Sequence, residues 1–172
     1  VMFGRKTNSD PTDKTYEWDG YLWKEIVLSD PEGDGNPSAR YNHSMVYNAV
    51  KDRIVLFGGW TDKSENSSEM WEYDGKSWKK ITPESIQNPT ARNSHAMVYN
   101  ILSNKIILFG GLTDSGRTDE LWEFDGESWE KITPESVQNP TARNSHSMVY
   151  NIFSNKIILF GGLTASGRTD EL

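Results

Sequence analysis

A unit of about fifty residues repeats along this chain of 172 residues, and this repetition constrains the fold more than any other feature. Asp-Gly pairs recur at 19–20, 74–75 and 125–126, and Gly-Gly pairs recur at 58–59, 110–111 and 161–162. Segments 79–121 and 130–172 align without a gap and differ at five of their 43 positions. Such identity indicates either duplication with little later divergence or design. In both cases the units are expected to fold alike and to pack against one another.

Each full unit contains the signals of four short antiparallel strands, here labelled a to d. In one unit the strands are predicted at 95–100, 105–111, 120–126 and 128–133. Strand b is a continuous apolar run, which is typical of a strand buried on both faces, and it ends at two glycines. Asp125-Gly126 marks the turn between strands c and d, because both residue types tolerate positive φ. Helix caps and helical periodicity are absent, so the chain is predicted to be all-β.

Several of these elements fall in register in each copy and resemble the kelch repeat. They are the arginine of ARNSH (91–95), the double glycine of ILFGG (107–111) and the aromatic turn of WEFDGESW (122–129). The resemblance covers essentially the whole chain and implies a β-propeller, in which each unit forms one four-stranded blade around a central channel. The first unit departs from the pattern, with a single Gly4 and with Tyr16 in place of the first Trp, so we expect an irregular blade there.

The repeats define about three blades, whereas propellers typically close with four to eight. We expect residues 1–38 to form a partial blade (strands b, c and d), 39–90 and 91–141 to form full blades, and 142–172 to form a partial blade (a and b). Closure then requires either another copy of the chain or further blades of a longer parent chain. A homodimer would give a six-bladed ring, with strand 157–160 of one copy beside strand 16–19 of the other.

Composition narrows the range of partners. The net charge is −7, from 18 basic and 25 acidic residues, which argues against nucleic acid as a partner. The longest apolar runs are far too short to cross a bilayer, so no membrane insertion is expected. The chain has no cysteine, which excludes disulfides and thiol chemistry. These features do not define a compartment, and a secreted or cell-surface location stays open.

All three histidines, His43, His95 and His146, occupy the same repeat position. A metal site, a catalytic ring and a structural group used three times are the possible interpretations. Each unit offers one His without a companion His or Cys and without a carboxylate at fixed spacing, which argues against a metal. We therefore interpret the histidines as structural groups that hydrogen-bond to neighbouring loops. No catalytic residue, metal ligand or cofactor is predicted.

The candidate ligand-binding residues are Arg40, Arg92, Arg143 and Trp60. The arginines precede strand a, where long loops such as 82–94 and 112–119 reach the mouth of the predicted channel, and such loops commonly carry binding residues. The resemblance to kelch adaptor proteins implies that the arginines can face an acidic peptide. Their alternative role is structural pairing with carbonyls or with the carboxylates of 118–120. Trp60 stands where other units have leucine, and both loop packing and ligand contact are open for it.

Three classes of function compete. The preferred hypothesis is a non-enzymatic kelch-repeat module for binding or assembly, which presents its b–c and d–a loops to a protein or other ligand. A glycan-binding or adhesive surface module is an alternative that the Trp and Asn content permits. The third is the propeller part of an enzyme similar to galactose oxidase. That resemblance implies copper held by Tyr and His beside a Tyr–Cys crosslink, and this chain has no Cys.

Overall fold

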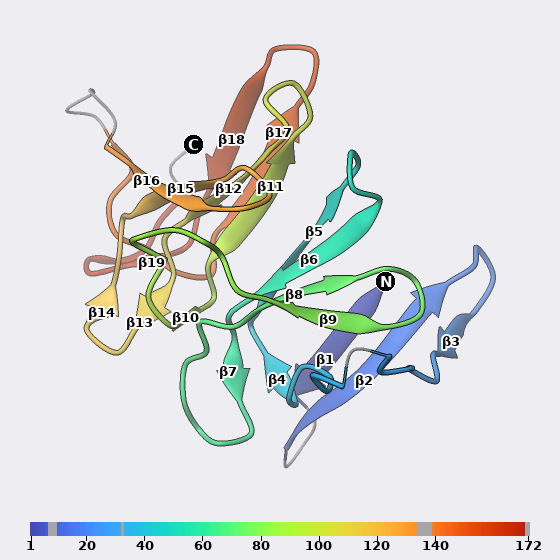
Figure 1. Cartoon of the computed structure of the whole chain (residues 1–172). Helices are drawn as coiled ribbons and strands as arrows, with labels where there is room; N and C mark the ends of the chain where they lie inside the picture. Colours follow the sequence, from blue (N-terminus) through green and yellow to red (C-terminus); the bar gives the residue numbers. More distant parts are fainter. Residues whose placement is uncertain (7–9, 32, 134–138, 171–172) are drawn as a thin grey trace.

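The computed structural model describes residues 1–6, 10–31, 33–133 and 139–170, and its sheets follow one another in an open arc (Figure 1). Blade 1 contains β1 (Met2–Lys6), β2 (Pro11–Trp18) and β3 (Trp23–Glu25). Blade 2 contains β5 (Ser44–Asn48), β6 (Arg53–Phe57), β8 (Met70–Tyr73) and β9 (Trp78–Ile81). Blade 3 contains β11 (Ala96–Asn100), β12 (Lys105–Phe109), β15 (Leu121–Phe124) and β16 (Trp129–Ile132). The terminal hairpin contains β17 (Ser147–Asn151) and β18 (Lys156–Phe160).

The described residues contain no helix, and all neighbouring strands within these sheets are antiparallel. The all-β prediction is therefore confirmed, and the four strands predicted for one unit are β11, β12, β15 and β16. Blade 1 is irregular as expected, because its register shifts between Phe3 and Arg5. The unit boundaries after residues 38, 90 and 141 stay a prediction.

The Asp-Gly turns between strands c and d use the two residues in different ways. The Asp125 carboxylate accepts hydrogen bonds from the backbone N–H groups of Glu127 and Ser128 at 2.9 and 2.8 Å. Gly126 alone adopts positive φ, at 106°. Asp74 and Gly75 repeat this arrangement in blade 2. The aspartate thus stabilises the turn through its side chain rather than through its own backbone conformation.

The double glycines are required by close contact with the next unit. Gly110 and Gly111 have φ values of 67° and 106°. A Cβ on Gly110 would lie 2.6 Å from the carbonyl oxygen of Arg143, and the N–H of Gly111 donates to that oxygen at 2.8 Å. Only glycine permits both this approach and this backbone conformation. The end of strand b in one unit is therefore fastened to the start of strand a in the next.

The long loops form short ladders of their own at the end of the sheets opposite the a–b turns (Figure 1). β4 (Arg40–Tyr41) pairs with β7 (Trp60–Thr61). β10 (Arg92–Asn93) pairs with β13 (Leu112–Thr113), which pairs with β14 (Gly116–Arg117). β19 (Leu163–Thr164) pairs with β20 (Gly167–Arg168). Backbone pairing therefore orders the b–c loops and the last residues of the d–a loops, at 40–41 and 92–93.

The apolar core lies between blades. Phe57 of blade 2 packs against Trp129 of blade 3 with ring centroids 5.6 Å apart, and Phe3 packs against Trp78 in the same way at 5.4 Å. One cluster joins blades 2 and 3, and another joins blades 1 and 2. Blades 2 and 3 thus bury the aromatic residues of their c–d hairpins against the preceding blade.

The two ends of the arc expose apolar side chains. Trp18 and Trp23 of blade 1 are 50% and 51% exposed, although Tyr73 and Trp78, at the same repeat positions in blade 2, are buried. Trp78 and Trp129 are 0% and 5% exposed, because each has a preceding blade to pack against. At the other end Phe160 is 51% exposed.

In the described part of the chain, no helix is long and apolar enough to cross a membrane.

Candidate functional site

The three predicted arginines lie at one repeated position before strand a, and all are buried. Arg40 and Arg92 expose 0% of their surface and Arg143 exposes 1%. Each Nη1 donates to the carbonyl of the first glycine in its own unit, Gly58, Gly110 or Gly161, at 3.1, 3.0 and 3.0 Å. Each Nε donates to the carbonyl two residues earlier in the chain. The guanidinium groups therefore tie the end of strand b to the segment that enters strand a.

A glutamate completes the arginine site in blades 2 and 3. Arg92 Nη2 lies 2.6 Å from Glu120 Oε2, which also accepts a hydrogen bond from Trp122 Nε1 at 3.2 Å. Lys131 Nζ lies 2.6 Å from the other carboxylate oxygen. Blade 2 repeats this cluster with Arg40, Glu69, Trp71 and Lys80. The alternative of structural pairing with the carboxylates of 118–120 is thus observed for Arg92.

The glutamates remain charged well into the acid range. Partial burial acts to raise the pKa of Glu120, but hydrogen bonds from Lys131 and Arg92 outweigh burial and hold that pKa at about 2. The pKa of Glu69 is about 2 for the same reasons. A charged partner is what a buried guanidinium requires. The residue that would play this part for Arg143 is at position 171, outside the described residues. Ligand contact by the arginines stays a prediction.

The histidines lie against the double glycines. The ring of His95, 6% exposed, stands edge-on to Phe57 of the preceding blade with centroids 5.5 Å apart. A Cβ on Gly58 would meet His95 Cε1 at 2.9 Å, so the ring fills the space that the glycine leaves. Among the described atoms, Nδ1 and Nε2 of His95 and of His146 have no hydrogen-bond partner. The rings of His95 and His146 are therefore packing groups, and the hydrogen bonds expected from them to neighbouring loops are not formed.

Burial keeps these rings neutral. Burial first, and then the charge of Arg92, lower the pKa of His95 to about 3, and the Phe57 carbonyl opposes this shift only weakly. The pKa values of His43 and His146 fall to about 4, again through burial and the neighbouring arginine. Within the described residues, no three His, Cys, Asp or Glu side chains are grouped so that they could hold a metal ion.

Trp60 lies in the same ladder as Arg40. Its backbone is opposite Tyr41, while Arg40 is opposite the next residue, Thr61. Trp60 also forms a bridge with Asn66 in its own loop, and its side chain is partly exposed. The structure therefore brings Trp60 near the arginine site of blade 2, on the side where the long loops gather. Its role in ligand contact stays a prediction.

Polar contacts link the loops of neighbouring units on this side. Ser94 N donates to Asn42 O at 2.7 Å, and Ser145 N donates to Ser94 O at 2.8 Å. These three residues share one repeat position and adopt φ values of 55–58°. Side chains extend the connection, since Asn66 donates to Asp114 and Arg117 donates to Asn144. We call this surface, formed by the b–c and d–a loops, the loop face.

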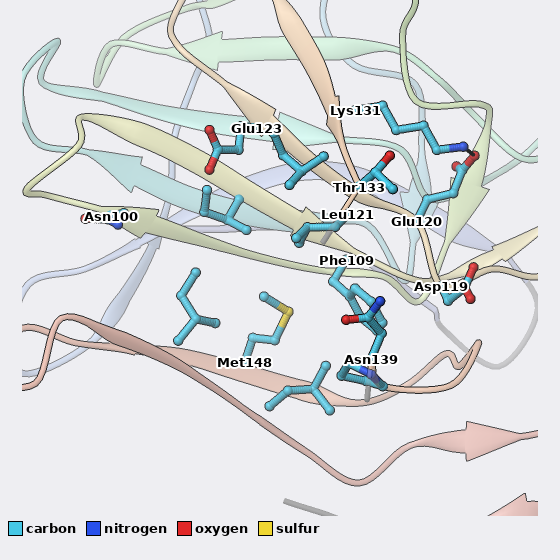
Figure 2. A pocket seen from close by; sticks show the side chains of 15 residues that line it. Asn100, Phe109, Asp119, Glu120, Leu121, Glu123, Lys131, Thr133, Asn139 and Met148 are labelled. Atoms are coloured by element: carbon cyan, nitrogen blue, oxygen red, sulfur yellow. Dashed lines mark hydrogen bonds and ion pairs between the residues drawn. The ribbon is translucent and has the colours of Figure 1, made fainter. Parts of the chain in front are cut away.

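A cavity of about 460 Å³ lies between blade 3 and the terminal hairpin. Figure 2 shows Phe109 and Leu121 of blade 3 on one side of it and Met148 of β17 on the other, with the Glu120–Lys131 ion pair at the rim. Ile157 and Leu159 of β18 complete the apolar wall. The sequence predicted that the arc needs another copy or further blades to close, but it did not predict this cavity. Alignment of the repeats could have located the cavity. The residues that line it occupy the same repeat positions as residues of the packed core between blades 2 and 3.

Comparison with known proteins places these features in a family. The model of the KLHDC2/KLHL20/DRC7 Kelch-repeats domain matches residues 1–172. The chain belongs to the kelch-repeat family, and its sheets are blades of a kelch propeller that is not closed.

Relatives carry the repeat within longer chains. An F-box/kelch-repeat protein of Arabidopsis thaliana is 29% identical over 154 residues, which are 81% of this chain and 30% of that protein. The host cell factor homolog hcf-1 of Caenorhabditis elegans is 31% identical over 136 residues, or 75% of this chain and 17% of that protein. The flagellar outer-arm dynein alpha chain of Chlamydomonas reinhardtii is 29% identical over 164 residues, which are 86% of this chain and 3% of that protein. The chain therefore spans less than a third of the length of these curated relatives.

Proposed function

We propose that this chain is a non-enzymatic protein-binding module that presents its loop face to a partner. The observation that carries the proposal is the order of that face. Buried arginines, two-residue ladders and hydrogen bonds such as Ser145 N to Ser94 O hold successive loops in fixed relative positions. Long loops on a rigid scaffold suit recognition. Relatives as different as an F-box protein and a dynein chain share the repeat, which supports a module used in different assemblies.

Site-specific photo-crosslinking tests the choice of face. A photoreactive amino acid replaces Asp62, an exposed residue in the loop that follows Trp60, and in a matched protein it replaces Leu102, an exposed residue of an a–b turn. Both proteins are incubated with extract and irradiated. We expect discrete crosslinked proteins from position 62 and none of these from position 102. Equal products from both positions, or products from 102 alone, would place recognition elsewhere.

The arginines need a test that separates contact from support. Arg92→Ala removes the guanidinium, whereas Glu120→Gln weakens its internal partner and leaves the arginine in place. If Arg92 contacts the partner, Arg92→Ala lowers affinity more than Glu120→Gln does at equal thermal stability. If Arg92 only supports the loops, affinity and stability fall together in both variants. Trp60→Ala is compared with Leu112→Ala, its counterpart in the next unit.

A second proposal concerns assembly. The half-exposed Trp18 and Trp23 at one end and Phe160 at the other favour end-to-end association, because apolar burial contributes about 25 cal/mol per Å². Two copies joined at both ends would form a six-bladed ring. In this chain β1 already pairs with β2, with Met2 opposite Tyr16. Strand β18 of one copy would therefore have to replace β1 of the other in order to lie beside β2.

A further inference from the structure

The loop face of blade 2 carries an aromatic pair that the next two units lack. In blade 3, Leu112 of β13 is opposite Arg117 of β14, and the terminal unit repeats this leucine and arginine in β19 and β20. The corresponding residue of blade 2 is Trp60, which is opposite Tyr41 on one side and bridged to Asn66 on the other. Blade 2 therefore has a tryptophan where the next units have leucine, and a neutral amide where they have a cation.

The exposed charges beside this tryptophan are mainly acidic. The loop between β7 and β8 exposes Asp62 and Glu65 against Lys63. The Asp114 carboxylate of the next unit joins them, because it accepts a hydrogen bond from Asn66 at 2.7 Å. Three carboxylates and one ammonium group give this patch a net charge of −2. Among the described residues, none of the three carboxylates forms an ion pair.

The arginine of the same unit adds no exposed positive charge to the patch. Arg40 is fully buried, and its Nη2 lies 2.6 Å from a carboxylate oxygen of Glu69. Its other donors bond to the carbonyls of Ser38 and Gly58 and to the hydroxyl groups of Ser38 and Ser67. A partner that reaches this part of the loop face therefore meets carboxylates and an indole ring rather than a guanidinium group.

Elsewhere the chain combines a tryptophan and a carboxylate to hold an ammonium group. Lys80 Nζ lies 5.6 Å from the ring centre of Trp71 and 2.5 Å from Glu69. Blade 3 repeats this arrangement with Lys131, at 5.8 and 2.6 Å. The face of an indole ring attracts a cation because it is electron-rich. Trp60 also has carboxylates beside it, but in the described part of the chain no Lys or Arg lies over its ring.

We propose that Trp60 and the carboxylates around it form a docking site for a basic segment of a partner protein. A Lys or Arg side chain of that segment lies over the indole ring, and Glu65 and Asp114 attract the same residue or its basic neighbours. The inference rests on the proposed function, because it gives the chemistry of the partner that the loop face receives. Blade 2 provides this site and the next two units do not, since they have leucine and arginine in its place.

The probe is a hexalysine peptide with an N-terminal fluorescein, whose binding to the whole chain is followed by anisotropy. Two variants introduce the residues of the next unit, Trp60→Leu and Asn66→Arg. We expect Trp60→Leu to weaken binding about three- to tenfold, as the loss of a cation–π contact predicts. Asn66→Arg should weaken binding at least as much, because it places a cation of the chain in the site. A hexaglutamine peptide with the same label should not bind.

A matched pair of charge variants distinguishes this site from general attraction to an acidic chain. Glu65→Gln and Glu127→Gln each remove one exposed negative charge, the first beside Trp60 and the second in the c–d turn of blade 3. At about 0.15 M salt, charges more than about 8 Å apart are largely screened. Glu65→Gln should therefore weaken binding about two- to fivefold, and Glu127→Gln should leave it unchanged.

Nuclear magnetic resonance locates the bound peptide. The indole N–H signal that is absent from the Trp60→Leu spectrum should shift when hexalysine is added to the parent chain. Thermal unfolding verifies that each variant is folded, and if Trp60→Leu does not fold, Asn66→Arg and the two Gln variants decide. The inference is overturned if hexalysine shows no saturable binding or if the folded site variants bind it like the parent chain. It is also overturned if Glu65→Gln and Glu127→Gln have the same effect.

The crosslinking experiment separates this inference from the proposed function. If position 62 captures proteins and excess hexalysine prevents their capture, both proposals are supported. If the same proteins are captured in excess hexalysine, the basic docking site is overturned while the loop face stands. If hexalysine binds at Trp60 but position 62 captures no protein, the docking site for basic residues stands and the proposed function fails.

Discussion

Single residues in this chain derive their roles from the neighbouring unit. The N–H of Gly111 donates to the carbonyl of Arg143, whereas the side chain of Arg143 bonds to Gly161 of its own unit. His95 fills the space beside Gly58 and takes no hydrogen bond in the described structure. The sequence showed that these residue types recur, and it suggested the pairing of Arg92 with a carboxylate. It could not show which neighbour each residue meets, since that depends on how the blades stack.

Replacement of a glycine by alanine tests this dependence on the next unit. Gly110 and Gly161 have nearly the same φ, 67° and 70°, but a Cβ meets the Arg143 carbonyl at 2.6 Å only at Gly110. At Gly161 the nearest contact is 3.4 Å away. Left-handed backbone costs alanine roughly 1 kcal/mol, so Gly161→Ala should lose about that much stability. Gly110→Ala should lose more, because the clash adds to the same backbone cost. Denaturant unfolding measures both, and equal losses would contradict the account.

The buried histidines predict a fall in stability with acidity. The pKa of His95 is about 3 in the folded chain, against 6.5 ordinarily, so the unfolded chain takes up a proton first. Stability from this group is complete above pH 6.5 and is lost as the pH falls toward 3. The glutamates Glu69 and Glu120 have pKa values of about 2 in the folded chain, so the stability that they contribute is lost only below about pH 4.5. Unfolding curves at pH 7.5, 6 and 5 should show the decline.

His95→Leu is the control for this pH effect. The variant should show a smaller decline between pH 7.5 and 5 than the parent chain, whatever its stability at pH 7.5. A parent chain whose stability is flat over this range, or a variant with an unchanged decline, would contradict the assignment.

At the scale of the element, local pattern predicted the regular strands and missed the short ladders. Apolar runs and Asp-Gly turns located β12, β15 and β16 because these signals lie within a few residues of one another. The β4–β7 and β10–β13 ladders have two residues a strand, and they form because loops from different parts of the unit meet.

Two tryptophans at the same repeat position should differ in their contribution to stability. Trp129 is 5% exposed and packs on Phe57, whereas Trp23 is 51% exposed at the end of the arc. Truncation of a buried aromatic residue typically costs 3–5 kcal/mol, and we expect about that loss for Trp129→Ala. Trp23→Ala should cost less than about 1 kcal/mol in the monomer. Thermal or denaturant unfolding measures both losses of stability. A similar loss in both variants would show that packing between blades does not account for the contribution of Trp129.

At the scale of the whole molecule, the chain is an arc of kelch blades whose two ends expose apolar side chains. Blades 2 and 3 bury the aromatic residues of their c–d hairpins against the preceding blade, while the first blade exposes Trp18 and Trp23 and the terminal hairpin exposes Phe160. The resemblance of the repeats to the kelch family was sufficient to predict this architecture, and the family match confirms it. The sequence could not predict the cavity beside β18, because its shape follows from the position of the terminal hairpin against blade 3.

The central claim is that these ends need a neighbour, and the mass of the purified chain in solution tests it most directly. Light scattering from about 1 to 100 μM should show species heavier than the 19.6 kDa of one chain, with a two-chain mass for a closed ring. Substitution of Trp18 and Trp23 by Ala should shift the population toward one-chain mass without unfolding blades 2 and 3. A compact species of one-chain mass across the whole concentration range, with no tendency to associate, would contradict the claim.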